Sequence, residues 1–383
     1  TRIYQYSSNG WSQLGQDLFG GSGDMSGESV SLSADGTIVA ISDYTHDSDK
    51  GRTRIWKYRT VTESEWRSNI TFIATIDQTG VGDGNTTGGS RGEDYSSTTK
   101  YWTQLGSDID GDPGDFSGHS VSLSVDGTIV AIGALAYNSY QGRTRIYQYS
   151  SNTNTWSKLG QDLIGDADDS SGTSVSLSAD GTIVAIGAYA HDSSKGRTRI
   201  YQYSSNTWSQ LGQDLVGEED GDRSGWSVSL SADGTIVAIG ADLYDDTNEG
   251  RTRIYQYSSN TWSQLGQDLV GDNGDNNGYS VSLSADGTIV AIGAHFHDSG
   301  KGRTRIYQYS CNTWIQLGQD LVGEPSDSSG NSVSLSADGT IVAIGASNHD
   351  SLKGRTRIYH LSEYFKSNVR IDNNLNVVGD VDI

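Results

Sequence analysis

One pattern of apolar and polar positions recurs along the chain, and its clearest copy runs from Ser224 to Leu265. The copy begins with S-V-S-L-S, where apolar and small polar residues alternate, and this alternation predicts a strand. The Asp-Gly step that follows predicts a tight hairpin in which both turn residues have positive φ. The next run, from Ile236 to Ile239, is continuously apolar, as expected for a strand covered on both faces.

The second half of the unit predicts two more strands. A polar loop of seven or eight residues leads to R-T-R-I-Y-Q-Y from Arg251, and an S-S-N-T turn then precedes W-S-Q-L-G-Q-D-L. The Asp-Gly step recurs after 52 to 54 residues, and T-R-I occurs seven times. A period of this length, built from four short strands, is typical of propeller blades. The chain is therefore predicted to be an all-β propeller of four-stranded antiparallel blades, with a repeat of about 53 residues.

The seven T-R-I strands predict seven blades, one of which the N-terminus closes by pairing with a segment near the C-terminus. Residues 369–378 could supply the missing partners of that blade. Alternatively, this segment is the fourth strand of the preceding blade, which leaves six blades or an incomplete seventh. We expect residues 1–362 to form one propeller, residues 59–101 to be an insertion in a loop between third and fourth strands, and residues 363–383 to be closing strands or the start of a β-repeat stalk.

Composition narrows the possible partners. The net charge of −22 excludes nucleic acid and anionic membranes as expected partners. Thirteen of the 26 basic residues lie in the R-T-R strands, where we expect neighbouring carboxylates and tyrosine rings to hold them. Cys311 is the single cysteine, so a disulfide framework is excluded. The apolar runs are too short to span a membrane, so direct membrane insertion is not expected.

The insertion and the N-terminus bear on localisation. Both N-x-S/T sequons, Asn69 and Asn85, fall inside residues 59–101, which fits a glycosylated loop of a secreted protein. The chain opens in the middle of a motif at Thr1, which we interpret as a processed or trimmed end. We expect an extracellular, cell-surface or virion-surface location.

The repeat resembles the FG-GAP repeat of integrin α-subunit propellers. The matching positions are Gly225, Ser227 and Val228 for F-G-x-S-V, Gly240 and Ala241 for G-A-P, and 250–257 for G-x-V-Y-V-Y. Ser224 replaces the family's Phe and Asp242 its Pro, and a tight S-A-D-G-T turn replaces its D-x-D-x-D-G calcium loop. The resemblance therefore implies a propeller used for recognition, without that metal site. Residues 373–383 are similar to β-repeats in viral and phage fibre stalks.

Antiparallel connectivity places the two loops that vary between copies on one face. The slot after S-G holds in turn Glu28, His119, Thr173, Trp226, Tyr279 and Asn331. Aromatic residues standing among carboxylates and amides suit a glycan or protein partner; neutral drift of the copies would explain the variation equally well. The candidate binding residues are His119, Trp226, Tyr279, Tyr44, Tyr137, Tyr189, Tyr244 and Phe296.

Calcium is the one cofactor that the acidic loops suggest. Asp108, Asp110, Asp112 and Asp115 are spaced so that their oxygens could surround a hard cation. Alternatively, these are solvated acidic turns. The four H-D-S triplets indicate turns rather than catalytic triads, because neighbours in sequence rarely face one another in a triad.

These observations together predict a non-enzymatic recognition or adhesion module that binds a protein or glycan through one acidic face. The first alternative is the structural head of a surface filament or viral fibre, which would self-associate. The second, less favoured, is a polysaccharide-active enzyme.

Overall fold

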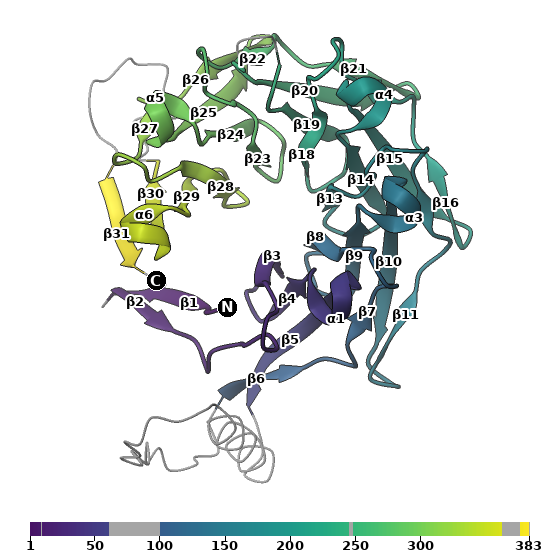
Figure 1. The fold of residues 1–383 in the computed structure, drawn as a ribbon. Helices are drawn as coiled ribbons and strands as arrows, with labels where there is room; N and C mark the ends of the chain where they lie inside the picture. The colour runs from purple at the N-terminus through teal and green to yellow at the C-terminus, as the bar shows by residue number, and fades with distance from the viewer. Residues whose placement is uncertain (9, 61–99, 245–247, 362–375, 383) are drawn as a thin grey trace.

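The computed structural model describes residues 1–8, 10–60, 100–244, 248–361 and 376–382. It shows an all-β propeller in which six four-stranded antiparallel sheets are arranged around a central axis (Figure 1). Among the described residues, none of the helices has the length and apolar composition needed to cross a bilayer.

Each blade starts at the axis and ends at the rim of the ring. The strands of blades 1 to 3 are β3 (Ser26–Leu32), β4 (Ile38–Asp43), β5 (Arg52–Thr60) and β6 (Lys100–Gln104); β8 (Ser117–Leu123), β9 (Ile129–Ala134), β10 (Arg143–Ser150) and β11 (Thr155–Lys158); and β13 (Ser174–Leu177), β14 (Ile183–Ala188), β15 (Arg197–Ser204) and β16 (Thr207–Gln210). Those of blades 4 to 6 are β18 (Ser224–Leu230), β19 (Ile236–Ala241), β20 (Arg251–Ser258) and β21 (Thr261–Gln264); β23 (Ser280–Leu283), β24 (Ile289–Ala294), β25 (Arg303–Ser310) and β26 (Thr313–Gln316); and β28 (Ser329–Leu335), β29 (Ile341–Ala346), β30 (Arg355–His360) and β31 (Asn376–Asp382).

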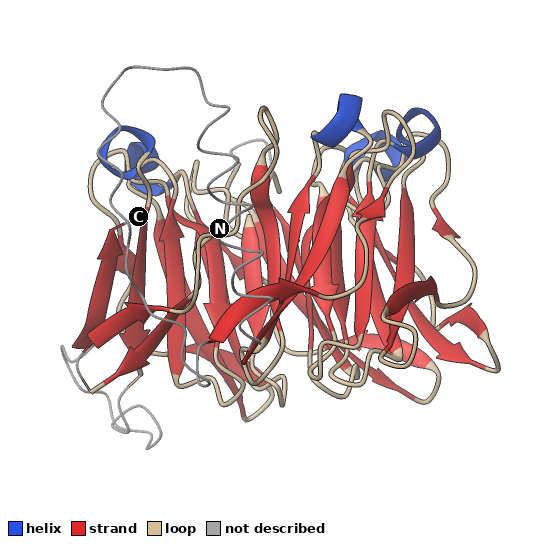
Figure 2. Ribbon diagram, turned by 90° about the horizontal axis from the view of Figure 1, so that it is seen from below, coloured by secondary structure: helices blue, strands red, loops and turns tan. Residues whose placement is uncertain are grey.

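Short elements complete the blades. Two-residue strands extend the outer edge of blades 1 to 5: β7 (Ile109–Asp110), β12 (Leu163–Ile164), β17 (Leu215–Val216), β22 (Leu269–Val270) and β27 (Leu321–Val322). Four-residue helical turns follow the second strand in five blades: α1 (His46–Asp49), α3 (Tyr137–Tyr140), α4 (His191–Ser194), α5 (His297–Gly300) and α6 (His349–Leu352). Figure 2 shows that these helical turns all lie on one face of the ring, so the loops between second and third strands share a face in these five blades, as expected.

The prediction of seven blades is wrong, because the chain forms six. The N-terminal strands β1 (Tyr4–Ser7) and β2 (Gly10–Gln13) pair with each other as a separate two-stranded sheet. The C-terminal β31 pairs with β30 as the fourth strand of blade 6, which is the alternative placement of that segment. The reason lies in the repeat count: T-R-I occurs seven times, but the S-V-S-L-S and Asp-Gly hairpin only six times. Residues 369–375, with the Asn373-Asn374 turn, lie outside the described residues.

The Asp-Gly turn differs from its prediction in conformation. Gly234 has φ +70°, whereas Asp233 does not have positive φ. The Asp233 carboxylate accepts hydrogen bonds from the Ser231 hydroxyl and the Thr235 N–H, at 2.6 and 3.0 Å, so the side chain stabilises a longer loop. Two consecutive positive φ values occur instead in the second turn, at Ser205 (51°) and Asn206 (63°).

The hydrophobic core lies between blades rather than within them. The second strand is buried along its whole length in blades 1 to 4, which confirms the prediction from its apolar run. Val175 and Leu177 of blade 3, for example, pack with Ile129 and Ile146 of blade 2. The fourth-strand tryptophans of blades 1 to 5 each donate a hydrogen bond from Nε1–H to a leucine carbonyl of the preceding unit. Trp208, for example, is 3% exposed and donates to the Leu159 carbonyl at 2.8 Å.

Serine side chains join the innermost strands around the axis. Ser174 Oγ donates to the Gly225 carbonyl of the next blade at 2.8 Å. The Ser122 hydroxyl accepts from the Leu177 N–H at 3.0 Å. These bonds explain why the inner strand alternates serine with Val and Leu. The apolar side chains pack on one neighbouring blade, and the serine hydroxyls form hydrogen bonds with backbone groups that have no partner within the sheet.

Candidate functional site

The six blades bring two variable positions each to one end of the axis, and we call these twelve residues the axial mouth. The first position is the residue directly after S-G on the innermost strand of each blade. The second position is the residue directly after the end of each blade's second β-strand. The residues at the second position are Tyr44, Leu135, Tyr189, Asp242, His295 and Ser347. Their neighbours on the strands are nearly constant between copies, so the chain varies its chemistry mainly here.

Side chains from blades 3, 4 and 5 form a continuous aromatic row at the mouth. The ring centroids of Tyr189 and Trp226 are 5.2 Å apart, and those of Trp226 and Tyr279 are 5.5 Å apart. Tyr279 lies 3.9 Å from His295, which in turn lies 4.3 Å from Phe296. Burial raises the pKa of Tyr279, and the negative charges of Asp242 and Glu28 add to this effect. Because Glu28 belongs to blade 1 and Tyr279 to blade 5, the row faces a carboxylate from the other side of the axis.

Asp242 is the most unusual group of the axial mouth. It is 2% exposed, and its Oδ1 has no hydrogen-bond partner among the described residues. Its Oδ2 forms a long ion pair with Arg223, whose Nη1 lies 3.8 Å away. Burial raises the pKa of Asp242 to about 6, although the Arg223 charge opposes the rise. Asp242 therefore changes its charge near neutral pH, as general acids and bases do.

His295 is a second buried group without a partner. It is 9% exposed, and its Nδ1 has no hydrogen-bond partner among the described residues. Burial lowers the pKa of His295 to about 4, so the ring is neutral at pH 7. Asp242 and His295 occupy the same position in adjacent blades, where Leu135 and Ser347 stand elsewhere.

Arg223 differs from the arginines of the R-T-R strands. In blades 2 to 5 each of those arginines has a carboxylate oxygen at 3.1 Å or less, which confirms that they are held by carboxylates. Arg223 instead lies 5.5 Å from the centre of the Trp226 ring and 5.7 Å from that of Tyr189, and its side chain is 35% exposed. Its φ of +59° is unfavourable for a long side chain. The positively charged head is thus available at the edge of the aromatic row.

The structure brings most of the predicted binding residues together. Trp226, Tyr279 and Tyr189 form the aromatic row, and Phe296, which is 54% exposed, extends it. Tyr44 and His119 form a separate contact from blades 1 and 2, with ring centroids 5.9 Å apart.

Tyr137 and Tyr244 have a different role. They stand where other blades have the histidine of H-D-S, and their rings stack on the guanidinium groups of Arg143 and Arg251 at 4.0 and 3.9 Å. They therefore stabilise the R-T-R strands rather than line the mouth.

Sequence reasoning did not select Asp242, His295 or Arg223 as site residues. For Asp242 and His295 the signal was their type: of the six residues at this position, which also include Tyr44, Leu135, Tyr189 and Ser347, they are the two whose charge can change between pH 4 and 7. For Arg223 the signal was its charge: the other blades have the uncharged residues Met25, Phe116, Ser170, Asn276 and Ser328 at this position.

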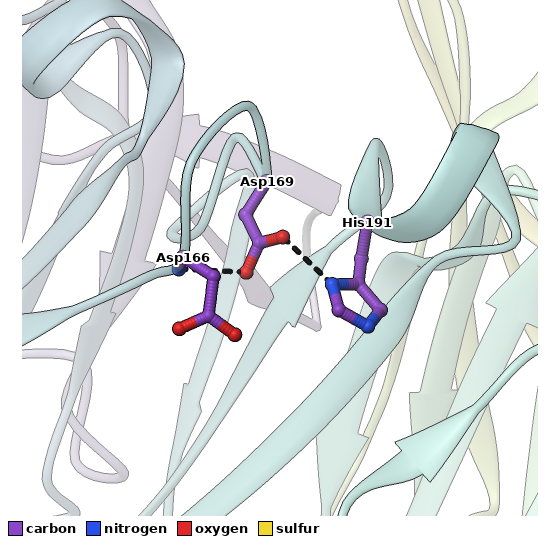
Figure 3. A group of neighbouring side chains, drawn as sticks. All are labelled: Asp166, Asp169 and His191. Atoms are coloured by element: carbon purple, nitrogen blue, oxygen red, sulfur yellow. Dashed lines mark hydrogen bonds and ion pairs between the residues drawn. The ribbon is translucent and has the colours of Figure 1, made fainter.

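Acidic clusters with a histidine recur on the same face. Figure 3 shows Asp166, Asp169 and His191, whose ligand atoms all lie within 4.8 Å of one another. Asp169 Oδ1 is 2.7 Å from His191 Nδ1, and Oδ2 contacts the Arg197 guanidinium. Arg197 Nη2 also lies 2.8 Å from Asp166. An arginine already supplies the positive charge that a metal ion would bring, so we interpret the cluster as a structural clamp.

The four aspartates of the calcium hypothesis have different partners. Asp108 contacts Arg52 at 3.4 Å, whereas Asp112 and Asp115 contact Arg143 at 2.9 and 2.5 Å. Asp110 pairs with Arg52 along the backbone of β7. Calcium binding in this loop stays a prediction. Asn69 and Asn85 lie outside the described residues, so their glycosylation stays a prediction as well.

Comparisons with known proteins agree on the fold. Neither a protein-family model nor a curated protein matches the chain. A Bacteroides uniformis protein provisionally named a 6-phosphogluconolactonase is similar in structure, with a TM-score of 0.62 and 12% identity, over 100% of this chain and 92% of its own. A Bacteroides fragilis protein with the same provisional name gives a TM-score of 0.60 and 10% identity, over 100% and 90%. Hydrazine synthase of Kuenenia stuttgartiensis gives 0.50 and 13%, over 86% and 82%.

These comparisons correct the expectation of a non-enzymatic adhesion module. The similar structures carry the names of enzymes, and none of these three is named as an adhesion protein. Repeated blades and variable loops therefore do not distinguish a recognition protein from an enzyme in this fold. At 10–13% identity the likeness shows the fold alone. The function must be argued from the axial mouth.

Proposed function

We propose that the axial mouth is the active site of a hydrolase that opens the cyclic ester of a sugar acid. The observation that carries the proposal is Asp242, a buried carboxyl group with an unpartnered oxygen and a pKa of about 6. Such a group can accept and return a proton near neutral pH. The aromatic row beside it offers flat faces for a sugar ring.

Each part of the mouth has a role in this reaction. The Asp242 carboxylate accepts a proton from a water molecule as its oxygen attacks the ester carbonyl. The Arg223 guanidinium stabilises the negative charge that develops on the carbonyl oxygen. The ester bond then breaks, and the proton passes from Asp242 to the departing ring oxygen, which leaves the open hydroxy acid. Because Asp242 is 2% exposed, the reaction requires the flexible Arg223 side chain to move away from the carboxyl group when substrate enters.

Charge supports a neutral substrate rather than a phosphorylated one. The twelve residues of the mouth include the acidic Glu28 and Asp242 and no arginine or lysine, and Arg223 lies beside them, 3.8 Å from Asp242. A phosphate group would normally be held by several arginines or lysines, whereas the R-T-R arginines of blades 2 to 5 are already paired with carboxylates. The proposal therefore departs from the phosphorylated substrate in the names of the similar Bacteroides proteins.

The test is the pH dependence of hydrolysis of a neutral aldonic acid lactone, followed by proton release. We expect a rate that rises with pH through about 6, because the carboxylate form of Asp242 is the active one. Asp242→Asn should lower the rate by about 10²–10⁴-fold, and Trp226→Ala should mainly weaken substrate binding. Asp350→Asn is the control, because Asp350 is an exposed loop residue paired with Lys353. Hydrolysis no faster than in buffer, or equal rates for wild type and Asp242→Asn, would refute the proposal.

A further inference from the structure

Blades 1 and 6 each expose apolar side chains whose equivalents in other blades are covered by a neighbouring blade. Val30 and Leu32 on the inner strand of blade 1 are 51% and 50% exposed. Seven of their ten counterparts in blades 2 to 6 are 7–9% exposed: Val121, Val175, Val228, Leu123, Leu177, Leu230 and Leu283. The other three, Val281, Val333 and Leu335, are half-buried. The repeat thus acts as its own control, since the same residue types in the same strand differ only in having a blade beside them.

Blade 6 also has an apolar residue that is exposed although its counterparts in other blades are buried. Ile341 at the start of its second strand is 39% exposed. Its counterparts in blades 1 to 4 are 6–9% exposed: Ile38, Ile129, Ile183 and Ile236. In those blades the Val and Leu of the next inner strand cover this position, as Val121 and Leu123 cover Ile38. The exposed faces of blades 6 and 1 therefore flank one gap in the ring.

Hydrogen bonds between blades stop at the same gap. At five junctions the residue before the Asp-Gly step donates its N–H to the next blade: Ala34 to Val125, Val125 to Ala179, Ala179 to Ala232, Ala232 to Ala285 and Ala285 to Ala337. Among the described residues, the Ala337 N–H has no such acceptor. Gly36 at the tip of the blade 1 turn has no atom within 4 Å of an added Cβ, whereas Gly127 would meet Ile38 at 2.8 Å.

The outer part of the gap is already filled. Strands β1 and β2 carry the sequence of third and fourth strands, and they lie between blade 6 and blade 1 (Figure 1). Ile3 and Leu18 pack with Val39 and Ile41 of blade 1, as a neighbouring blade would. In all six blades the T-R-I strand pairs with a second strand, but the only described partner of β1 is β2. Among the residues that the structure describes, no inner hairpin of two strands lies beside β1.

We propose that this gap is a binding site for a β-hairpin with the sequence of the repeat's own inner strands, supplied from outside the six blades. The first strand of the hairpin covers Ile341 with its Val and Leu. The second strand pairs with the edge of β1 opposite β2 and is covered by Val30 and Leu32. An Asp-Gly turn places its backbone groups against Ala337 on one side and Ala34 on the other.

The chemistry of the gap favours such a hairpin over a second copy of the chain. All six inner hairpins of a copy are integrated in its own blades, so none is available for exchange without unfolding. The five closed junctions between blades all use the same register of side-chain packing and hydrogen bonds, and the gap lies at the position of the next such junction. A ligand that repeats the sequence satisfies every position of that register, whereas an unrelated apolar segment would leave backbone groups of Ala337 and β1 without partners.

The test uses a synthetic peptide that copies Gly172 to Ala188, which is one inner hairpin. We expect it to bind the whole chain with a stoichiometry of one in calorimetry and to raise the melting temperature, because a ligand that binds the folded state stabilises it. Val30→Asp should weaken binding at least about tenfold, since the hairpin would bury the new charge. Val125→Asp is the matched control: Val125 is 48% exposed and lies away from the gap, so binding should persist.

Three outcomes would overturn the proposal. The first is a peptide that does not bind. The second is equal binding of the peptide and of a version in which its Val and Leu are replaced by aspartate. The third is a chain that dimerises by itself and becomes monomeric with Val30→Asp, since the gap would then accommodate a second copy.

Discussion

At the scale of single residues, the axial mouth depends on side chains that the repeat elsewhere does not use. Asp242 and His295 are buried without described hydrogen-bond partners, and an unpaired buried polar group costs stability. Burial raises the pKa of Asp242 to about 6 and lowers the pKa of His295 to about 4. Groups kept in this condition are typical of functional sites.

Asp242 should make the protein less stable as pH rises through its titration range. Its pKa rises from 3.8 in the unfolded chain to about 6 in the folded one, so the folded state binds more protons between these values. Stability therefore falls as pH rises from about 4 to about 6. Relative to wild type, Asp242→Asn should gain up to about 3 kcal/mol of unfolding free energy over this range, measured by urea unfolding at several pH values.

The His295 contribution has the opposite sign, because a lowered histidine pKa reduces stability as pH falls. It is present in both proteins and cancels in the difference. A stability difference that does not change between pH 4 and 7 would show that Asp242 is not buried in its neutral form.

At the scale of elements, each blade is held to its incoming loop by an arginine clamp. Asp169 is 1% exposed and joins Arg197 of β15 to His191 of α4. The same arrangement recurs in blade 5 with Asp275, Arg303 and His297. The H-D-S triplets are thus part of turns, as the sequence indicated, and the histidine also holds an aspartate that the sequence places 22 residues earlier.

Breaking the clamp should destabilise the propeller. Asp169→Asn leaves the Arg197 guanidinium, which is 4% exposed, with less negative charge around it. We expect a loss of about 2 kcal/mol or more, because removal of one member of a buried ion pair leaves a poorly compensated charge. Asp192→Asn is the control: its pair with Lys195 is at the surface, and its urea unfolding curve should match that of wild type. Equal curves for the two variants would contradict a structural clamp.

At the scale of the whole molecule, hydrogen bonds join the described blades at five junctions and are absent from the described residues between blades 6 and 1. The same leucine therefore has two environments in one chain: Leu123 is 8% exposed and Leu32 is 50% exposed. We expect Leu123→Ala to lower the unfolding free energy by about 2–4 kcal/mol, and Leu32→Ala to lower it by less than about 1 kcal/mol. Urea unfolding of the two variants measures the difference. Similar losses would show that the gap is closed in solution.

Much of the fold could be predicted from the sequence because the pattern is repeated. A strand that alternates Ser with Val and Leu, followed by a continuously apolar strand, has one way to bury its apolar side chains, which is against the next copy. The R-T-R arginines also lie beside carboxylates, as expected. The candidate site was found in part: Trp226 and Tyr279 meet at the mouth, whereas Tyr137 and Tyr244 stack on arginines instead.

The sequence by itself determined the blade, its strand order and the face on which copies differ, because these follow from local periodicity and turn residues. The partner of the C-terminal strand was decided by the tertiary structure: β31 pairs with the open edge of β30, although its sequence suits pairing with the N-terminal strands equally well. The chemistry of Asp242 was also decided there. A carboxyl group acquires a pKa of about 6 through burial between blades, and burial arises only when the ring assembles.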